Sequence, residues 1–223
     1  MTKPFLFLSD FDGTLSDKDF FHVIIDRHFA DQREKLYDDW DKKVMTDLEY
    51  LSRLFRSVDR DQAQIDEDID AVPFDPDAKK VIEKVKKLGG DFVVISAGTD
   101  YYIKRIFEKQ GITGVKIYSN PGVYENRGIQ LRPDPNGTYF SELYGIDKQK
   151  LARDLMKDYD TVFFAGDSLP DLKAAMLADT IFAKGKLQPL LDQENKEYVA
   201  INNFKDIEKF LDIHEEAIIN GSR

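Results

Sequence analysis

The feature that most constrains this chain is an apolar run that ends in two aspartates. Phe5-Leu6-Phe7-Leu8 is followed directly by Ser9-Asp10-Phe11-Asp12-Gly13-Thr14. A run of this length predicts a buried strand, and the glycine predicts a tight turn at its end. The carboxyl ends of parallel strands open on the ligand crevice of an α/β sheet. Asp10 and Asp12 are therefore expected where such a fold carries out chemistry.

Further apolar runs indicate a parallel sheet around this first strand. They occupy Phe92–Ile95, Val115–Tyr118, Thr161–Ala165 and Ile181–Ala183, and helical patterns separate them. Strands that alternate with helices predict right-handed crossovers. The fold class is therefore predicted to be α/β, with a Rossmann-like parallel sheet as its core.

Residues 17–75 break this alternation. They contain no strand-like run, no glycine occurs between Gly13 and Gly89, and apolar residues recur at helical spacing over 20–25 and 48–55. We interpret this segment as a helical cap inserted into a core made of residues 1–16 and 76–223. The alternative is that these helices simply pack on the sheet.

A second irregular interval, residues 120–145, is predicted to form a small β-flap. It is rich in glycine, asparagine and proline. Asn136-Gly137, followed by Thr138-Tyr139-Phe140, is typical of a hairpin turn.

Composition limits the partners that the chain can have. Its 223 residues are 42% hydrophobic and 33% charged, which indicates a soluble globular protein, and the net charge of −10 disfavours nucleic acid or an anionic membrane surface as a partner. The absence of cysteine agrees with a reducing compartment. We find neither a membrane span nor room for a signal peptide, and so expect a cytoplasmic monomer or homodimer.

A second pair of acids follows the apolar run at 161–165. Asp167 and Asp171 lie in Gly166-Asp167-Ser168-Leu169-Pro170-Asp171. If both strands are neighbours, the carboxylates converge, and two like charges about 4 Å apart repel by about 4 kcal/mol at an effective dielectric near 20. Such a cluster needs a cation or shared protons, and oxygen ligands without Cys or His favour Mg²⁺ over zinc. A single aspartate at a strand end is otherwise usually a turn residue or helix cap.

Together these motifs resemble those of the haloacid dehalogenase superfamily. The first is Asp10-Phe11-Asp12-Gly13-Thr14, and the second is the strand that ends Val93-Val94-Ile95-Ser96-Ala97-Gly98. The third is a lysine that begins a helix, Lys148, with Lys150 as a rival, and the fourth is Gly166–Asp171. They occur in the superfamily's order and span about 160 residues.

The resemblance implies a role for each of these residues. Asp10 is expected to be the nucleophile and Asp12 the general acid and base. Asp10, the backbone carbonyl of Asp12, and Asp167 are expected to hold Mg²⁺. The Ser96 hydroxyl, the Ala97 amide and Lys148 are expected to bind the phosphoryl oxygens, and Asp171 to be a further metal ligand or to orient the others.

Within the superfamily, the chain resembles the phosphoserine phosphatase-like branch. Its methionine-salvage and phosphoethanolamine/phosphocholine phosphatases are the nearest in motif. Asp19 and Asp100 then become candidate substrate contacts, although both could equally be helix caps. The three histidines have no metal-ligand spacing and are interpreted as surface or cap residues.

The predicted function is magnesium-dependent hydrolysis of a small phosphorylated metabolite through an aspartyl phosphate. A phosphomutase with the same nucleophile, or a non-catalytic protein that binds a phosphorylated ligand, are the alternatives.

Overall fold

A six-stranded parallel sheet forms the centre of the protein. The computed structural model describes residues 5–220. The strand order is β3-β2-β1-β6-β7-β8, and every pairing between neighbours is parallel. The strands are β1 (Leu6–Ser9), β2 (Asp91–Thr99), β3 (Lys116–Asn120), β6 (Val162–Gly166), β7 (Thr180–Ala183) and β8 (Val199–Ala200). The predicted α/β class is confirmed, and the short edge strand β8 is an addition to it.

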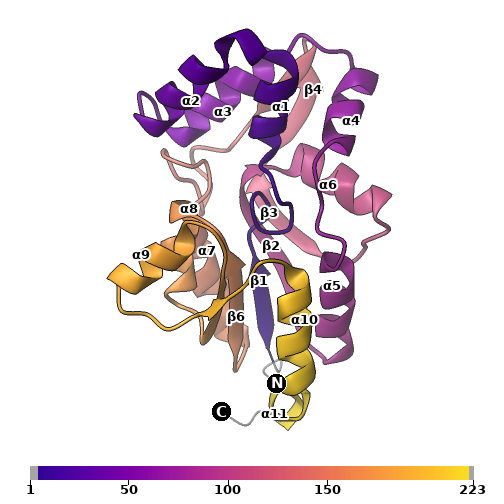
Figure 1. Cartoon of the computed structure of the whole chain (residues 1–223), viewed down its shortest axis with the longest axis vertical. Helices are drawn as coiled ribbons and strands as arrows, with labels where there is room; N and C mark the ends of the chain where they lie inside the picture. Colours follow the sequence, from indigo (N-terminus) through magenta and orange to yellow (C-terminus); the bar gives the residue numbers. More distant parts are fainter. Residues whose placement is uncertain (1–4, 221–223) are drawn as a thin grey trace.

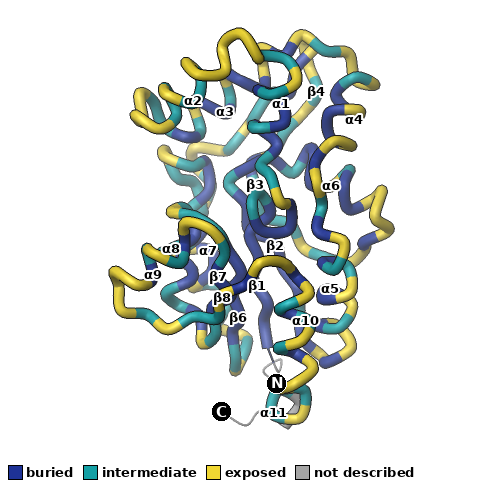
Figure 2. Tube along the Cα trace, viewed as in Figure 1, coloured by how far each residue is buried: buried dark blue, intermediate teal, exposed yellow. Residues whose placement is uncertain are grey.

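Helices cover both faces of the sheet (Figure 1). One face carries α5 (Ala78–Lys87), α6 (Asp100–Lys109) and α10 (Phe204–Ile213), and the other carries α7 (Lys148–Leu155), α8 (Leu169–Ala175) and α9 (Leu187–Gln193). Alternation along β1 explains this, because Phe7 packs with the first set while Leu6 and Leu8 pack with the second. The central strands β1 and β6 are therefore buried at every residue, whereas the edge strands β3 and β8 are partly exposed (Figure 2). The structure also contains two 3₁₀ turns, Ala30–Gln32 and Met156–Asp158, and the terminal helix α11 (Glu215–Asn220).

The strand order reverses direction at β1. Ser9 pairs with Val94 of β2 on one side and with Ala165 of β6 on the other. The chain leaves β1 towards one edge of the sheet and later returns to fill the opposite edge, so the crevice expected of an open α/β sheet lies at the carboxyl ends of β1, β2 and β6. Asp10 and Asp167 stand directly beyond the ends of β1 and β6, and Ser96 lies in the last part of β2.

Four helices lie between β1 and α5, and we refer to residues 17–75 as the cap. They are α1 (Phe20–His28), α2 (Arg33–Asp41), α3 (Asp47–Arg56) and α4 (Gln62–Asp70). The cap helices lie at the end of the molecule opposite α10 and α11 (Figure 1). Its entry and exit run side by side, because Ser16 bridges Phe74 and the Asp17 amide donates to the Pro73 carbonyl at 2.9 Å. That this segment is a separate domain with boundaries at 17 and 75 stays a prediction.

The predicted flap is a hairpin, but the predicted position of its turn was wrong. The strands are β4 (Gly122–Glu125) and β5 (Gly128–Leu131), joined through Asn126 and Arg127 at φ of 50° and 62°. Two consecutive residues with positive φ are typical of a type I′ turn. Asn136-Gly137 instead forms a turn without strands on either side. The flap packs on α3, where a Cβ at Gly128 would lie 2.8 Å from the carbonyl oxygens of Phe55 and Arg56.

Helices between residues 5 and 220 do not combine the length and the apolar character that a membrane span requires.

Candidate active site

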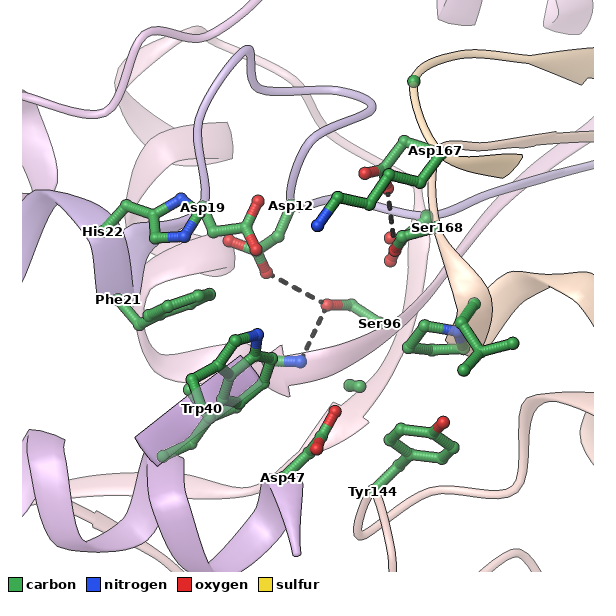
Figure 3. A pocket seen from close by; sticks show the side chains of 18 of the residues that line it. Asp12, Asp19, Phe21, His22, Trp40, Asp47, Ser96, Tyr144, Asp167 and Ser168 are labelled. Atoms are coloured by element: carbon green, nitrogen blue, oxygen red, sulfur yellow. Dashed lines mark hydrogen bonds between the residues drawn. The ribbon is translucent and has the colours of Figure 1, made fainter. Parts of the chain in front are cut away.

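A cavity of about 630 Å³ lies between the carboxyl ends of the sheet and the cap. Figure 3 shows Asp12, Ser96 and Asp167 on the core side of it, and Phe21, His22 and Trp40 on the cap side. Its core-side lining includes Asp10, Asp12, Ser96, Ala97, Gly98, Lys148 and Asp167. Its cap-side lining includes Asp19, Phe21, His22, Trp40, Lys43, Asp47, Leu51 and Phe55. Most residues predicted for the site therefore meet in one cavity.

Lys148 joins two of the four acids. Its Nζ donates to Asp10 Oδ1 and to Asp171 Oδ1, both at 2.7 Å, and the lysine is only 4% exposed. Asp147 sets this position, because its side chain accepts from the Lys150 amide at 2.9 Å and starts α7 at Lys148. Burial lowers the pKa of Lys148, but the two carboxylates outweigh it and hold that pKa above its usual range. Lys148 therefore stays charged, whereas Lys150 is exposed on the same helix.

Asp10, Asp167 and Asp171 could together hold a metal ion. One carboxylate oxygen from each lies within 4.8 Å of the others. Burial, and then the charge of Asp171, raise the pKa of Asp167 to about 7. Burial likewise raises the pKa of Asp10 well above its usual value, even though Lys148 opposes this. Within the described residues, Asp10 and Asp171 pair with one buried ammonium group, that of Lys148, and Asp167 pairs with none.

This donor set fits a hard divalent cation. All the candidate ligands are carboxylate oxygens, and one lysine leaves their negative charge undercompensated. Asp171 is the most constrained of them, because its Oδ2 accepts from the backbone amides of Asp167 at 3.0 Å and Ser168 at 3.3 Å. Asp171 therefore fixes the loop that carries Asp167, and Asp167 keeps an oxygen directed at the shared space.

Asp12 is held by donors from three separate elements. The Phe20 amide donates to Asp12 Oδ1 at 3.0 Å, Ser96 Oγ donates to Oδ2 at 3.4 Å, and the Tyr102 hydroxyl also donates to Oδ2. Burial raises the pKa of Asp12, while the Tyr102 and Phe20 hydrogen bonds lower it and do not cancel the rise. A carboxyl with a raised pKa that is fixed in place is suited to proton exchange.

The end of β2 supplies the side of the site that carries hydrogen-bond donors. Ser96 Oγ accepts from the Gly98 amide at 3.0 Å, and both residues line the cavity together with Ala97. Asn120 anchors this segment to the loop before α7, because its Nδ2 donates to the carbonyls of Ala97 at 2.8 Å and Tyr144 at 2.9 Å. The sequence patterns did not single out Asn120 or Tyr102.

The two candidate substrate contacts lie in different places. Asp19 lines the cavity just before α1, and its side chain makes no capping hydrogen bond. Burial, and then the charge of Asp12, raise the pKa of Asp19 well above its usual value. Asp100 is not brought to the cavity: its carboxylate accepts from the Gly122 amide at 2.9 Å and pairs with Lys104, so it ties α6 to the flap.

Several cavity residues of the cap carry no sequence signal. His22 was interpreted as a surface or cap residue; it lies in the cap but lines the cavity, and burial lowers its pKa to about 4. Lys43 Nζ lies 4.0 Å from the centre of the Trp40 ring and 2.8 Å from Asp47 Oδ1. These positions depend on how α1, α2 and the start of α3 pack together, which no local pattern reveals.

Comparisons with known proteins find similarity to phosphatases. Residues 5–136 match the family model described as "Putative Phosphatase". A 2-hydroxy-3-keto-5-methylthiopentenyl-1-phosphate phosphatase from Bacillus pumilus is 30% identical over 219 residues, covering 96% of this chain and 90% of that protein. The bifunctional enzyme MtnB/MtnX from Bacillus licheniformis is 27% identical over 219 residues, and this chain spans 50% of its length. A solved phosphoserine phosphatase with a phospho-aspartyl intermediate analogue has a TM-score of 0.68 at 20% identity, over 94% of this chain and 98% of that one, and so shares the fold.

Proposed function

We propose the following mechanism for this chain, which belongs to the "Putative Phosphatase" family of the haloacid dehalogenase superfamily and is a phosphoric monoester hydrolase. Asp10 is the nucleophile, and Asp12 is the general acid and base. The observation that carries this proposal is the position of Asp10. Its carboxylate follows β1 directly, lies 2.7 Å from the Lys148 ammonium and lines the cavity under the cap.

In the first step an oxygen of Asp10 attacks the phosphorus of the bound monoester. The bond from phosphorus to the leaving oxygen breaks, and its electron pair stays on that oxygen, which takes a proton from Asp12. The Lys148 ammonium, the Ser96 hydroxyl and the Ala97 amide offset the charge on the phosphoryl oxygens. The products of this step are an alcohol and a phosphorylated Asp10.

In the second step water attacks the same phosphorus from the side of the departed alcohol. Asp12, now a carboxylate, takes a proton from that water, and the bond from phosphorus to Asp10 breaks. Inorganic phosphate leaves, and both aspartates return to their starting states. The sum of the two steps is a monoester plus water giving an alcohol plus phosphate.

We assign Mg²⁺ as the cation, held by Asp10, Asp167 and the backbone carbonyl of Asp12, while Asp171 orients Asp167. When bound, Mg²⁺ supplies charge that favours the ionised forms of these carboxylates and neutralises the phosphoryl group. Its support here is the oxygen-only donor set and the undercompensated charge around Lys148. The cap at residues 17–75 would exclude water from this site when substrate binds.

For the substrate we propose 2-hydroxy-3-keto-5-methylthiopentenyl-1-phosphate, the molecule named for the similar phosphatases. Phe21, Leu51 and Phe55 give the cap side of the cavity an apolar wall. Burying about three methylene-sized groups there would gain roughly 2 kcal/mol, or about 30-fold in kcat/KM over an analogue without them. Asp19 is proposed to contact the hydroxyl and keto groups on the carbons next to the phosphate.

Phosphate release by wild-type protein, Asp10→Asn and the surface control Asp31→Asn tests the function. We expect Asp10→Asn to lose at least about 10³-fold in kcat with Mg²⁺, and the control to lose nothing. Full activity in Asp10→Asn would overturn the mechanism. The substrates to be assayed are the methylthiopentenyl phosphate, phosphoserine and phosphoethanolamine. A phosphorylated, rearranged product would indicate a phosphomutase, and binding without turnover would indicate a non-catalytic protein.

The cytoplasmic location and the state of the protein as a monomer or homodimer stay predictions.

A further inference from the structure

A buried tyrosine outside the predicted motifs contacts the proposed acid. Tyr102 lies in the first turn of α6, is 1% exposed, and donates its hydroxyl hydrogen bond to Asp12 Oδ2. It also lines the cavity. A buried tyrosine hydroxyl usually finds some partner, so the contact alone does not assign a role. The surroundings of the contact do.

The backbone at Gly98, opposite Tyr102, leaves no room for a side chain beside the contact between Tyr102 and Asp12. A Cβ at Gly98 would lie 1.8 Å from the Tyr102 hydroxyl oxygen and 2.6 Å from Asp12 Oδ2. Gly98 does not have a positive φ, so its backbone conformation does not require glycine. What requires glycine is the close approach of Tyr102 to Asp12.

The cap holds the other oxygen of the same carboxyl. The Phe20 amide, at the first residue of α1, donates to Asp12 Oδ1 at 3.0 Å. The Phe20 ring lies with its centre 4.6 Å from that of Tyr102, and the Phe55 ring of α3 lies 6.4 Å from it. Phe20 and Tyr102, which donate hydrogen bonds to the two oxygens of Asp12, therefore also pack on each other. This packing connects the cap with the proposed acid.

We propose that Tyr102 is a positioning residue, which together with the Phe20 amide holds the Asp12 carboxyl in the orientation that exchanges a proton with the leaving oxygen. This inference rests on the proposed role of Asp12. A carboxylate has about four acceptor positions. The Tyr102 hydroxyl occupies a position on Oδ2 and the Phe20 amide occupies one on Oδ1, so these two donors fix the carboxyl and leave the second position on Oδ1 for the transferred proton.

A merely structural role for Tyr102 has a different consequence. If the hydroxyl only satisfies the core, its loss should change stability, or slow all substrates alike. If the hydroxyl orients the acid, its loss should lower kcat most for substrates whose leaving group must be protonated. p-Nitrophenol leaves readily without protonation, whereas a simple alcohol does not.

The experiment compares Tyr102→Phe with Tyr101→Phe, using p-nitrophenyl phosphate and an alkyl phosphate. Tyr101 is a matched control, because it is the neighbouring buried tyrosine of α6 and its hydroxyl has no hydrogen-bond partner in the described part of the chain. We expect Tyr102→Phe to lower kcat for the alkyl phosphate by about 10- to 100-fold, a share of the 10²- to 10⁴-fold typical of general acid catalysis. For p-nitrophenyl phosphate we expect a change of less than about 3-fold, with KM unchanged for both. Tyr101→Phe should behave as wild type.

Gly98→Ala provides a second variant in which the tyrosine is kept. The added methyl group should displace the hydroxyl from Asp12 and reproduce the same dependence on the leaving group. Equal losses for both substrates in Tyr102→Phe, or no loss at all, would overturn the inference. Asp12→Asn separates the two levels of the proposal. If that variant hydrolyses the alkyl phosphate normally, the proposed acid is wrong; if it is inactive while Tyr102→Phe is normal, only the positioning role is wrong.

Discussion

Replacing Lys148 with methionine removes the ammonium group that pairs with both Asp10 and Asp171. Methionine keeps the length of the side chain but leaves Asp10 and Asp171 without their shared partner. We expect the metal-free variant to be less stable than the wild type by about 3–5 kcal/mol near pH 7.5, the usual cost of breaking a buried ion pair from one side.

The distances from Lys148 to its two carboxylate partners explain the size of this loss of stability. At an effective dielectric near 20, each 2.7 Å contact corresponds to about 6 kcal/mol of attraction. Desolvation of the lysine, which is 4% exposed, offsets much of the sum. The carboxyls of the variant can also bind protons, since burial already raises the pKa of Asp10. Their folded-state pKa values then lie above the unfolded ones, so the folded state binds more protons and the loss should shrink as the pH falls towards about 5.

Urea unfolding with a chelator present measures the difference. Lys150→Met is the control, because Lys150 lies on the same helix, is exposed and makes no side-chain ion pair within residues 5–220. It should cost less than about 0.5 kcal/mol. Equal losses in the two variants, or a loss at Lys148 that does not depend on pH, would refute the electrostatic reasoning.

Three further predictions concern the metal, a glycine and a histidine. Saturating Mg²⁺, at about 100 times its Kd, should stabilise the wild type by about 2.7 kcal/mol and leave Asp167→Asn unchanged, as read from urea midpoints; equal stabilisation of both would reject Asp167 as a ligand. Gly13→Ala should cost about 1–2 kcal/mol and weaken Mg²⁺ binding in the same titration, since Gly13 has φ of +78° and a Cβ would lie 2.5 Å from Asp167 Oδ2; wild-type Mg²⁺ affinity would contradict this. His22, with a pKa of about 4, stays neutral in the fold while its unfolded form binds a proton below about 6.5, so its contribution is complete above that pH and is lost as pH falls to about 4. Relative to His22→Gln, the wild type should lose roughly 1–2 kcal/mol over that range after allowance for solvent screening, and a constant difference would reject a neutral His22.

The core and its motifs could be predicted because their signals are local. The strand before Asp10 is a continuous apolar run, as buried parallel strands are, and Asp167 follows a second such run. Once both strands are placed in one sheet, the convergence of their acids follows from the common edge at which parallel strands end.

The cap and the flap were harder to predict from the sequence. The helix α2 has no buried residue and a polar sequence, so its apolar period is weak. The flap turns at Asn126-Arg127 instead of Asn136-Gly137, because only the former lies between segments that can pair and pack on α3. Turn chemistry shows where a chain can reverse, but the partners of the flanking strands decide where it does.

Two site features depended entirely on tertiary packing. Tyr102 occupies an apolar position of α6 by its helical spacing, and that spacing cannot reveal a hydroxyl aimed at Asp12. Asp100 has the residue type of a substrate contact, yet its helix directs it to the Gly122 amide of the flap. Residue type and motif spacing identified which groups could react, and packing decided which of them meet.

The most direct test of the mechanism is to trap the phosphorylated nucleophile. Wild-type protein is mixed with excess substrate and Mg²⁺, quenched within one turnover, and treated with borohydride, which reduces an acyl phosphate to an alcohol. Mass spectrometry of the peptide that contains residues 5–18 should then show homoserine at position 10, in an amount that falls as the substrate is exhausted. Rapid phosphate release without this product, or with reduction at another aspartate, would contradict the assignment of Asp10 as the nucleophile.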